Sequence, residues 1–303
     1  MRITFLGTAA ARPTVSRNVS SLTVQREGEL MMFDCGEGTQ RQMMRFGTGF
    51  NVRDIFFTHL HADHFLGVTG LLRTMGLQDR MEPIDLWTPG GTESLLRQAI
   101  ELGGDRVAFE VNIRGIEADQ PISRDLYDIV PFRTSHKGRS VGYAIVEHER
   151  PGRFDPETAR RLGIPEGPLW GKLHHGEAVE IDGRRVGPEK VVGPSRPGRR
   201  VVYTGDTRPD ASIRNAAQGA DLLIHEATFG MDEADRAVAT GHSTARQAAE
   251  VAREAGVLRL ALTHFSPRYA DDPRALEREA RSVFAETTAA FDGLVLEVPY
   301  RDA

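Results

Sequence analysis

The sequence predicts an α/β fold, with one domain spanning residues 1–303 and an extended arm inserted at 150–200. On both sides of this insertion, short apolar strand segments alternate with helical patterns, as in sheets that are covered by helices. The insertion breaks the alternation, because nine Gly and seven Pro fall within its 51 positions. Such a density of residues that interrupt regular structure is typical of an extended arm rather than of packed core.

The expected strands are short apolar or alternating runs bounded by Gly, Pro, Ser or Asn. They lie at 3–6, 21–25, 30–33, 55–58, 200–204, 220–224, 258–263 and 294–298, with further strands between 107 and 145. Helical patterns occupy 67–76, 92–102, 243–255 and about 273–284. Thr244 and Gln247 have the spacing of a capping box, which marks the start of the third of these helices.

Composition limits the kinds of partner and compartment. A net charge of −5 argues against indiscriminate binding to nucleic acids. The charge is uneven, however, because the arm holds eleven Lys/Arg and seven Asp/Glu, a net of +4, which leaves −9 for the rest. There is no apolar run of transmembrane length, no apparent secretory signal, and only one cysteine, Cys35. We therefore expect a cytoplasmic protein that uses no membrane.

Disorder is the alternative interpretation of the arm, and its apolar residues decide against it. The apolar anchors that favour a partly folded arm are Phe154, Leu162, Ile164, Leu169 and Trp170. The arm also carries the basic residues Arg153, Arg160, Arg161, Lys172, Arg184 and Arg185. On composition alone, a solvated charged loop and a basic clamp for a nucleic acid fit these residues equally well.

The densest chemical signal is the run His59-Leu60-His61-Ala62-Asp63-His64, directly after a predicted strand. Imidazole and carboxylate groups are ligands that Zn²⁺ and similar ions accept. His59 and His61 can reach one ion from a single turn, and Asp63 and His64 can point at a second. The alternative is a polar loop in which three histidines meet by chance, and such dense clustering of histidine argues against it.

Three more candidate ligands follow predicted strands elsewhere in the chain: His136, Asp206 and His264. A carboxylate such as Asp206 can bridge two cations, as two-metal hydrolases require. Each residue alone is better explained as a structural polar group, but together with the His59 cluster they favour ligation. Asp34, after another strand, is expected to bind backbone or to orient a histidine.

The pattern His59-x-His61-x-Asp63-His64, followed by His136, Asp206 and His264, resembles the metallo-β-lactamase superfamily. This resemblance implies a four-layer αββα sandwich with two zinc ions per chain at one sheet edge. It implies that His59, His61 and His136 hold one ion, that Asp63, His64 and His264 hold the other, and that Asp206 bridges them. Mn²⁺ accepts the same ligands.

Further segments resemble the ribonuclease Z family over essentially the whole chain. They are Gly205-Asp206-Thr207-Arg208-Pro209, His225-Glu226-Ala227-Thr228-Phe229, Gly241-His242-Ser243-Thr244, Thr263-His264-Phe265-Ser266-Pro267-Arg268-Tyr269 and the arm segment from Gly163 to Leu173. The resemblance implies a zinc-dependent endoribonuclease that removes the 3′ trailer of precursor tRNA, leaving a 3′-hydroxyl on the tRNA and a 5′-phosphate on the trailer. It also implies a homodimer in which the arm of one subunit binds tRNA for the active site of the other.

The same resemblance assigns catalytic roles. It implies that His242, supported by Glu226, gives a proton to the leaving oxygen; an adjacent carboxylate keeps an imidazole charged. Asp63 is expected to orient the attacking water in addition to ligating. Arg17, Asn18, Arg208, Arg268 and Lys172 are candidate substrate contacts. One departure stands out: Val15 occupies the position where many members carry a Lys, so a cation facing RNA is lost.

Two other functions fit parts of the pattern. The first is a small-molecule hydrolase, such as a phosphodiesterase or thioesterase, on the same metal core; a distant basic arm argues against it. The second is a non-catalytic RNA-binding protein with structural zinc. Structural zinc sites are usually closed and rich in cysteine, and this chain has one cysteine.

Overall fold

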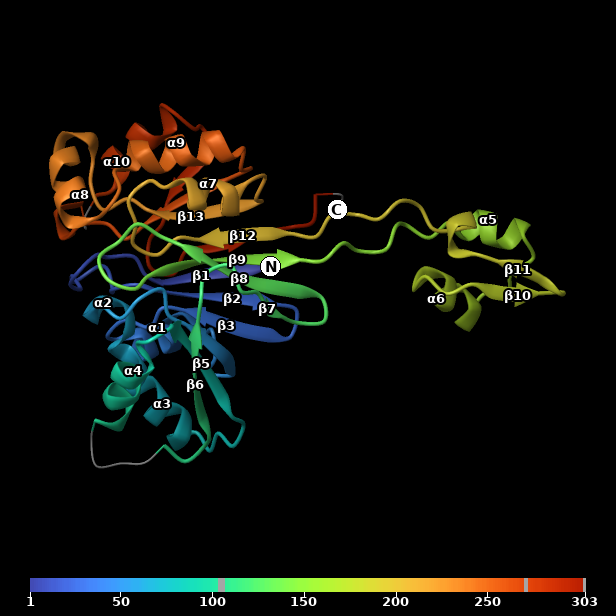
Figure 1. Cartoon of the computed structure of the whole chain (residues 1–303), viewed down its shortest axis with the longest axis horizontal. Coiled ribbons are helices and arrows are strands. Elements are labelled where there is room, and N and C mark those ends of the chain that lie inside the picture. The colour runs from blue at the N-terminus through green and yellow to red at the C-terminus, as the bar shows by residue number, and fades with distance from the viewer. Residues whose placement is uncertain (103–106, 270–271, 302–303) are drawn as a thin grey trace.

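The computed structural model describes residues 1–102, 107–269 and 272–301. In this part of the chain, two seven-stranded sheets pack face to face with helices on their outer faces, and an arm projects from one end (Figure 1). This is the expected αββα sandwich. No helix of the described residues is long and apolar enough to cross a membrane.

The first sheet has the strand order β16-β1-β2-β3-β4-β5-β6. Its strands are β1 (Arg2–Gly7), β2 (Ser21–Arg26), β3 (Glu29–Phe33), β4 (Val52–Phe56), β5 (Ile84–Pro89), β6 (Val111–Ile116) and β16 (Val295–Glu297). From β3 to β6 the strands run parallel. The helices packed with this half are α1 (Thr39–Phe46), α2 (Ala62–Phe65), α3 (Gly67–Leu77) and α4 (Glu93–Glu101).

The second sheet has the order β15-β14-β13-β12-β9-β8-β7. Its strands are β7 (Ile122–Ser123), β8 (Tyr127–Arg133), β9 (Val141–Glu147), β12 (Arg200–Tyr203), β13 (Leu222–Glu226), β14 (Leu260–Thr263) and β15 (Thr287–Ala289). Its outer face carries α7 (Ala211–Ala217), α9 (Ala245–Ala255) and α10 (Arg274–Arg281), and α8 (Ala234–Thr240) lies at one end (Figure 1). The predicted capping box is confirmed at Thr244 and Gln247.

The space between the sheets is filled by large apolar and aromatic side chains from both. Phe33 of β3 stacks on Phe56 of β4, with ring centroids 5.0 Å apart. Tyr143 of β9 meets both rings edge-on, at 5.6 and 5.4 Å. Offset and edge-to-face pairs of this kind are the favourable arrangements for aromatic rings. They hold the two sheets in one relative position.

The strand directions decide where polar side chains gather. Strands β12, β13 and β14 run parallel, and β8 runs the same way because β9 is antiparallel to both β8 and β12. Their carboxyl ends therefore share one edge of the second sheet. Ligands of α/β sheets commonly bind at such an edge. The carboxyl end of β4 meets this edge from the first sheet, since Val141 N donates to Thr58 O at 2.9 Å.

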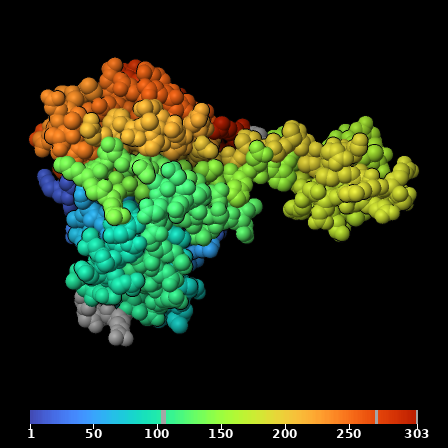
Figure 2. Space-filling view, viewed as in Figure 1, coloured from blue at the N-terminus to red at the C-terminus, as the bar shows by residue number. Residues whose placement is uncertain are grey.

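The arm leaves the body after β9 and returns at β12 (Figure 1). At its far end lie α5 (Pro156–Arg161), α6 (Pro168–His174), β10 (Val179–Ile181) and β11 (Arg184–Val186). They share a small core of Ala159, Ile164, Leu173, Val179 and Val191, flanked by Phe154, Leu169 and Trp170. Leu162, an expected anchor, is instead 43% exposed at the end of α5. Figure 2 shows this lobe as a separate knob on a narrow stalk.

Candidate metal centre and active site

The run from His59 to His64 passes from a strand end into a short helix. His59 lies just beyond β4, His61 is the N-cap of α2, and the single turn of α2 carries Asp63 and His64. The turn packs tightly on its surroundings, because a Cβ on Gly36 would lie 2.4 Å from the Asp63 carbonyl oxygen. The run is thus held as one rigid turn that aims four polar side chains inward.

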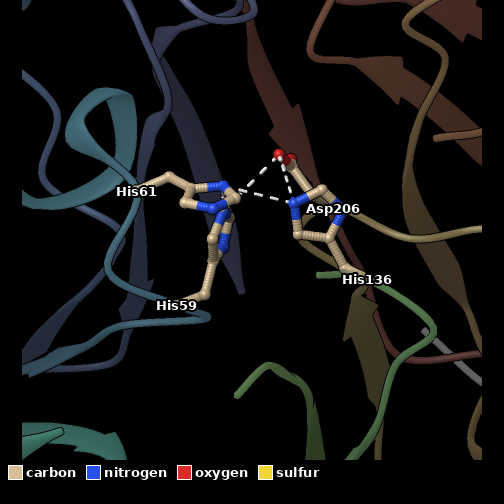
Figure 3. Close-up of side chains that lie close together, drawn as sticks. All are labelled: His59, His61, His136 and Asp206. Atoms are coloured by element: carbon tan, nitrogen blue, oxygen red, sulfur yellow. Dashed lines mark hydrogen bonds and ion pairs between the residues drawn. The ribbon is translucent and has the colours of Figure 1, made fainter. Parts of the chain in front are cut away.

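One group of candidate ligands combines His59, His61, His136 and Asp206 (Figure 3). Their nearest ligand atoms all lie within 4.8 Å of one another. His59 Nε2 is 3.0 Å from His61 Nδ1, and His136 Nε2 is 3.2 Å from the same nitrogen. Asp206 Oδ2 lies 3.6 Å from His59 Nε2 and 3.9 Å from His136 Nε2. Three strand ends thus contribute to one cluster.

A second group combines Asp63, His64 and His264. His264 Nε2 lies 3.3 Å from His64 Nε2 and 3.4 Å from Asp63 Oδ2. Asp206 Oδ1 lies 3.3 Å from His64 Nε2 and 3.2 Å from His264 Nε2. The two oxygens of Asp206 therefore face different groups, as a bridging carboxylate requires. Gly205 adopts a left-handed φ of +59° against Thr58, which leaves no room there for a side chain.

The other ring nitrogen of four of these histidines is engaged by a neighbouring oxygen. Asp34 Oδ2 lies 2.8 Å from His64 Nδ1, and Gly241 O lies 2.8 Å from His136 Nδ1. Thr58 Oγ1 and Thr228 Oγ1 contact the Nδ1 atoms of His59 and His264 at 3.0 and 2.9 Å. Such partners fix the ring orientation and leave Nε2 available as a ligand. Asp34 thus has the orienting contact expected of it.

Charges and burial show that this cluster suits cations. Burial, followed by the neighbouring His64, lowers the pKa of His59 well below its ordinary value, which favours the neutral, ligating imidazole. Burial would also lower the pKa of His64, but the carboxylates of Asp206, Asp34 and Asp63 raise it well above its ordinary value.

Among the described residues, Asp206 Oδ1 is buried and has no hydrogen-bond partner, although the Nε2 atoms of His64 and His264 lie 3.3 and 3.2 Å away. A buried carboxylate oxygen without a hydrogen bond is costly unless a cation meets it. The described residues therefore fit two metal ions.

The half-buried His242 and the buried Glu226 form a pair beside the candidate metal centre. His242 Nδ1 donates to Glu226 Oε1 at 2.8 Å. Burial would lower the pKa of His242, but the Glu226 carboxylate and its hydrogen bond raise it to about 9. Glu226 also accepts hydrogen bonds from Thr207 N, Thr228 Oγ1 and Ser243 N. These hydrogen bonds stabilise its negative charge in the interior of the protein. The pair can hold a protonated imidazole at the site.

An open pocket of about 460 Å³ lies over these side chains. His61, Asp63, Asp206, His242 and His264 form part of its wall. Its remaining lining includes Ala10, Ala11, Arg12, Phe229, Arg236, Thr240 and Arg268. A pocket lined by three arginines beside the candidate metal ligands Asp63 and Asp206 suits an anionic group that contacts both metal and guanidinium.

The expected substrate contacts are placed very differently. Arg268 lines the pocket, and it is held by Glu233. Arg208 and Lys172 are exposed but lie outside the pocket lining, Lys172 on the arm. Asn18 is half-buried, with its backbone N–H donating to Asp292 Oδ2 at 2.6 Å.

The expectation that Arg17 contacts the substrate requires a correction. Its guanidinium is buried, donates to Thr8 Oγ1 at 2.6 Å and to Ala290 O at 2.9 Å, and lies over the Phe265 ring. A group enclosed in this way anchors the loop that precedes it and reaches no phosphate.

Two pocket arginines, Arg12 and Arg236, had no signal in the sequence. Arg12 lies in the loop after β1, and Ala11 beside it has a positive φ of 60°. Ala11 N donates to Asp63 Oδ2 at 2.7 Å, which brings this loop over the metal centre. Arg236 extends from α8, a helix that the sequence did not predict, and lies over the Phe229 ring. Only the tertiary structure brings either residue to the pocket.

Comparisons with known proteins match this architecture. The family described as "Anti-Pycsar protein Apyc1" matches residues 1–144, and the one described as "Beta-lactamase superfamily domain" matches residues 175–265. Ribonuclease Z of Gemmatimonas aurantiaca is 58% identical, over 98% of this chain and 95% of its own length. Ribonuclease Z of Myxococcus xanthus is 52% identical, over 100% and 99%.

Solved structures also have a similar fold. The short form of human tRNase Z has a TM-score of 0.71 and 29% sequence identity, with 99% of this chain and 100% of that one covered. A long-form RNase Z from yeast has a TM-score of 0.63 and 22% identity, covering 98% of this chain and 42% of that one. With a sandwich fold, a two-group His/Asp cluster and full-length relatives of this similarity, the chain belongs to the ribonuclease Z family.

Proposed function

We propose that this chain is an endoribonuclease that removes the 3′ trailer of precursor tRNA. The observation that carries the proposal is Asp206, whose two oxygens face two ligand groups beneath an open pocket, with His242 in the pocket wall. This arrangement suits hydrolysis of a phosphodiester. The names of the full-length relatives supply the substrate class, and the products are a 3′-hydroxyl on the tRNA and a 5′-phosphate on the trailer.

The ligand set suits zinc. His59, His61 and His136 would hold one ion, Asp63, His64 and His264 the other, with Asp206 between them. Nitrogen and carboxylate ligands suit Zn²⁺, and Mn²⁺ accepts them as well. Two divalent ions held by these residues would supply activation of a water molecule near neutral pH and would offset the negative charge of the phosphate.

The protein's own groups then position the water and move the proton. The Asp63 carboxylate is steadied by the Ala11 N–H and orients the attacking water. His242, whose Nδ1 is committed to Glu226, has Nε2 left to donate a proton to the leaving 3′-oxygen. Proton transfer from a positioned group contributes about 10²–10⁴-fold to such reactions.

Arginines at the mouth of the pocket bind the flanking phosphates. Arg268 and Arg236 both pair with Glu233, which keeps the two guanidinium groups side by side at the rim. Arg12, in the loop after β1, also lines the pocket. Arg208 and Asn18, which lie outside the pocket lining, are assigned to more distant phosphates. Guanidinium groups suit phosphate because they present several donors in one plane.

The arm provides a second contact with the tRNA. The arm exposes Arg153, Arg160, Arg161, Lys172, Arg184 and Arg185. Double-stranded RNA is bound through its shape and backbone, for which a basic surface at a distance from the cut is suitable. We further propose a homodimer in the cytoplasm, in which each arm contributes to tRNA binding.

The test is cleavage of one labelled precursor tRNA with its 3′ end mapped, in Zn²⁺ or Mn²⁺. Wild type is expected to cut once after the discriminator base. Asp63→Ala and His242→Ala are expected to lose activity, and the exposed control Glu254→Gln to keep it.

Three outcomes would overturn parts of this function. No cut by metal-loaded wild type, together with hydrolysis of a chromogenic phosphodiester, would assign a small substrate. Tight tRNA binding without hydrolysis of any ester would indicate a non-catalytic protein. Full activity in His242→Ala would remove His242 from the mechanism.

A further inference from the structure

One aromatic side chain of the C-terminal segment, residues 298–301, contacts the root of the arm. The root is the place where the chain leaves the body near residue 150 and returns near residue 199. Tyr300 lies between Arg150, on the chain that leaves the body, and Arg199, on the chain that returns. Their guanidinium carbons are 3.4 and 3.9 Å from the ring centroid. Arg199 Nη2 also donates to the Tyr300 hydroxyl at 3.1 Å. Figure 1 shows the segment that follows β16 running toward these two chains.

Arg199 is itself fixed to both sheets. Its Nε and Nη2 donate to the two oxygens of Glu147, at 2.8 and 2.7 Å, and its Nη1 donates to Val298 O at 3.2 Å. Arg26 of β2 donates to the same Glu147 at 2.8 Å. The side chains of Arg26, Glu147 and Arg199 are only 7, 2 and 9% exposed. Buried, multiply bonded ion pairs hold a defined geometry.

Beyond this root, the two chains of the stalk are paired with each other. Arg150 N donates to Arg196 O at 2.8 Å and the reverse bond is 2.9 Å long. Gly193 N donates to Arg153 O, and Asp155 N to Val191 O. A Cβ on Gly152 would lie 2.0 Å from the Gly193 carbonyl oxygen, so the chains are in close contact. The stalk is a two-stranded ribbon, and its direction is set where it joins the body.

The segment that carries Tyr300 is anchored on its other side too. Arg301 Nε donates to Asp221 Oδ1 at 2.7 Å, and Asp221 Oδ2 accepts from Arg200 N at 2.7 Å. Val298 is paired with Met1 of the first sheet. The C-terminal segment therefore crosses the root of the arm, and Tyr300 is the side chain through which it contacts both stalk chains.

We propose that Tyr300 is a positioning residue that fixes the direction of the arm relative to the metal centre. The inference that this matters for precursor tRNA rests on the proposed function. A substrate bound at two sites gains affinity from the effective concentration that a well-directed connection provides. Loss of the Tyr300 ring lets the arm swing at its root, so tRNA binding weakens while the chemical step stays intact.

The first experiment measures the arm's direction without RNA or activity. Spin labels are attached at Ala178→Cys on the lobe and Arg253→Cys on α9, both exposed positions, and the buried Cys35 stays unlabelled. The parent and the ring-preserving Tyr300→Phe are expected to give a narrow distance distribution. Tyr300→Ala is expected to give a broad one. A distribution for Tyr300→Ala that matches the parent would overturn the proposal.

The second experiment separates binding from chemistry. With precursor tRNA, Tyr300→Ala is expected to raise KM about tenfold, with kcat within about twofold of the parent. Hydrolysis of a small chromogenic phosphodiester should be unchanged, and Tyr300→Phe should resemble the parent. An unchanged KM, or a fall in kcat for both substrates, would contradict the proposal.

A companion variant guards against misfolding. Arg150→Leu removes one face of the stack while leaving the backbone pairs of Arg150 with Arg196 in place. Like Tyr300→Ala, it is expected to broaden the distance distribution and to raise KM. A parental distance distribution together with a parental KM would contradict the proposal. If the parent itself cut no precursor tRNA, the proposed function would fail, and the spin-label result would still decide the role of Tyr300.

Discussion

His242 Nδ1 and Glu226 Oε1 are joined by a 2.8 Å hydrogen bond, which occupies one ring nitrogen and leaves Nε2 available at the pocket. The carboxylate raises the pKa of His242 to about 9, against the effect of burial. Under the proposed mechanism the protonated imidazole is the proton donor, so activity should persist below this pKa and fall above it. Bound cations lower the pKa in both wild type and variants, so comparison between them is the sharp test.

Glu226→Gln is therefore expected to move the alkaline limb of the kcat profile to lower pH. The neutral amide keeps the shape of Glu226 but no longer stabilises the imidazolium, so His242 loses its proton earlier. The measurement is kcat between pH 6 and about 10 at saturating precursor tRNA. An alkaline limb at the same pH in both proteins would show that another group titrates there.

Asp206→Asn should reduce metal binding more than any single change of a peripheral acid. The substitution removes the negative charge that faces both ligand groups and halves the number of good metal-binding oxygens at that position. Metal content by plasma mass spectrometry is expected to fall from about two ions per chain, the number that two-metal hydrolysis uses. Asp232→Asn, at an exposed position, is the matched control. Full metal content in Asp206→Asn would contradict the assigned bridge.

Chelation should lower the melting temperature. The candidate ligands follow strands of both sheets, so an ion that binds them binds only the folded chain and stabilises it by mass action. Calorimetry with and without EDTA is expected to show a lower Tm after chelation, restored by Zn²⁺. The same shift should be much smaller in Asp206→Asn. Equal shifts in both proteins would place the stabilising ion elsewhere.

Arg268→Ala should weaken substrate binding more than Arg208→Ala. Both side chains are exposed, but only Arg268 lines the pocket. Loss of a charge-assisted hydrogen bond to phosphate costs about 1.5–3 kcal/mol, or roughly ten- to hundredfold in KM. The measurement is kcat and KM on precursor tRNA for both variants. Equal effects would mean that the pocket rim is not where the flanking phosphate binds.

Much of this architecture follows from residues that are close in sequence. The strand before His59 and the strands before Asp206 and His264 are visible as apolar runs, and each candidate ligand lies just beyond the end of its strand. The four-layer arrangement followed from the resemblance rather than from periodicity. The helix α1 was missed, because in it only Met43, Met44 and Phe46 are apolar and two of these three are not buried.

The remaining features depend on contacts between distant segments. Arg17 looked like a surface cation, yet Thr8, Ala290 and Phe265 enclose it. Tyr300 carried no motif, and its role arises only where Arg150 and Arg199 meet around it. Sequence spacing does not contain such information, because partners such as Arg17 and Ala290, which are 273 positions apart, come together only through the packing of the two sheets.

At the root of the arm, Glu147 N donates to Arg199 O at 3.0 Å, and the strands that end and begin there are antiparallel neighbours. Seen from the sheet, everything between these two residues takes the place of a hairpin turn. Closing that turn needs the same two strand ends whether the connection is four residues or fifty. The lobe is therefore an exchangeable module: a lineage can lengthen, trim or replace it to follow a new RNA while the hydrolytic body is inherited unchanged.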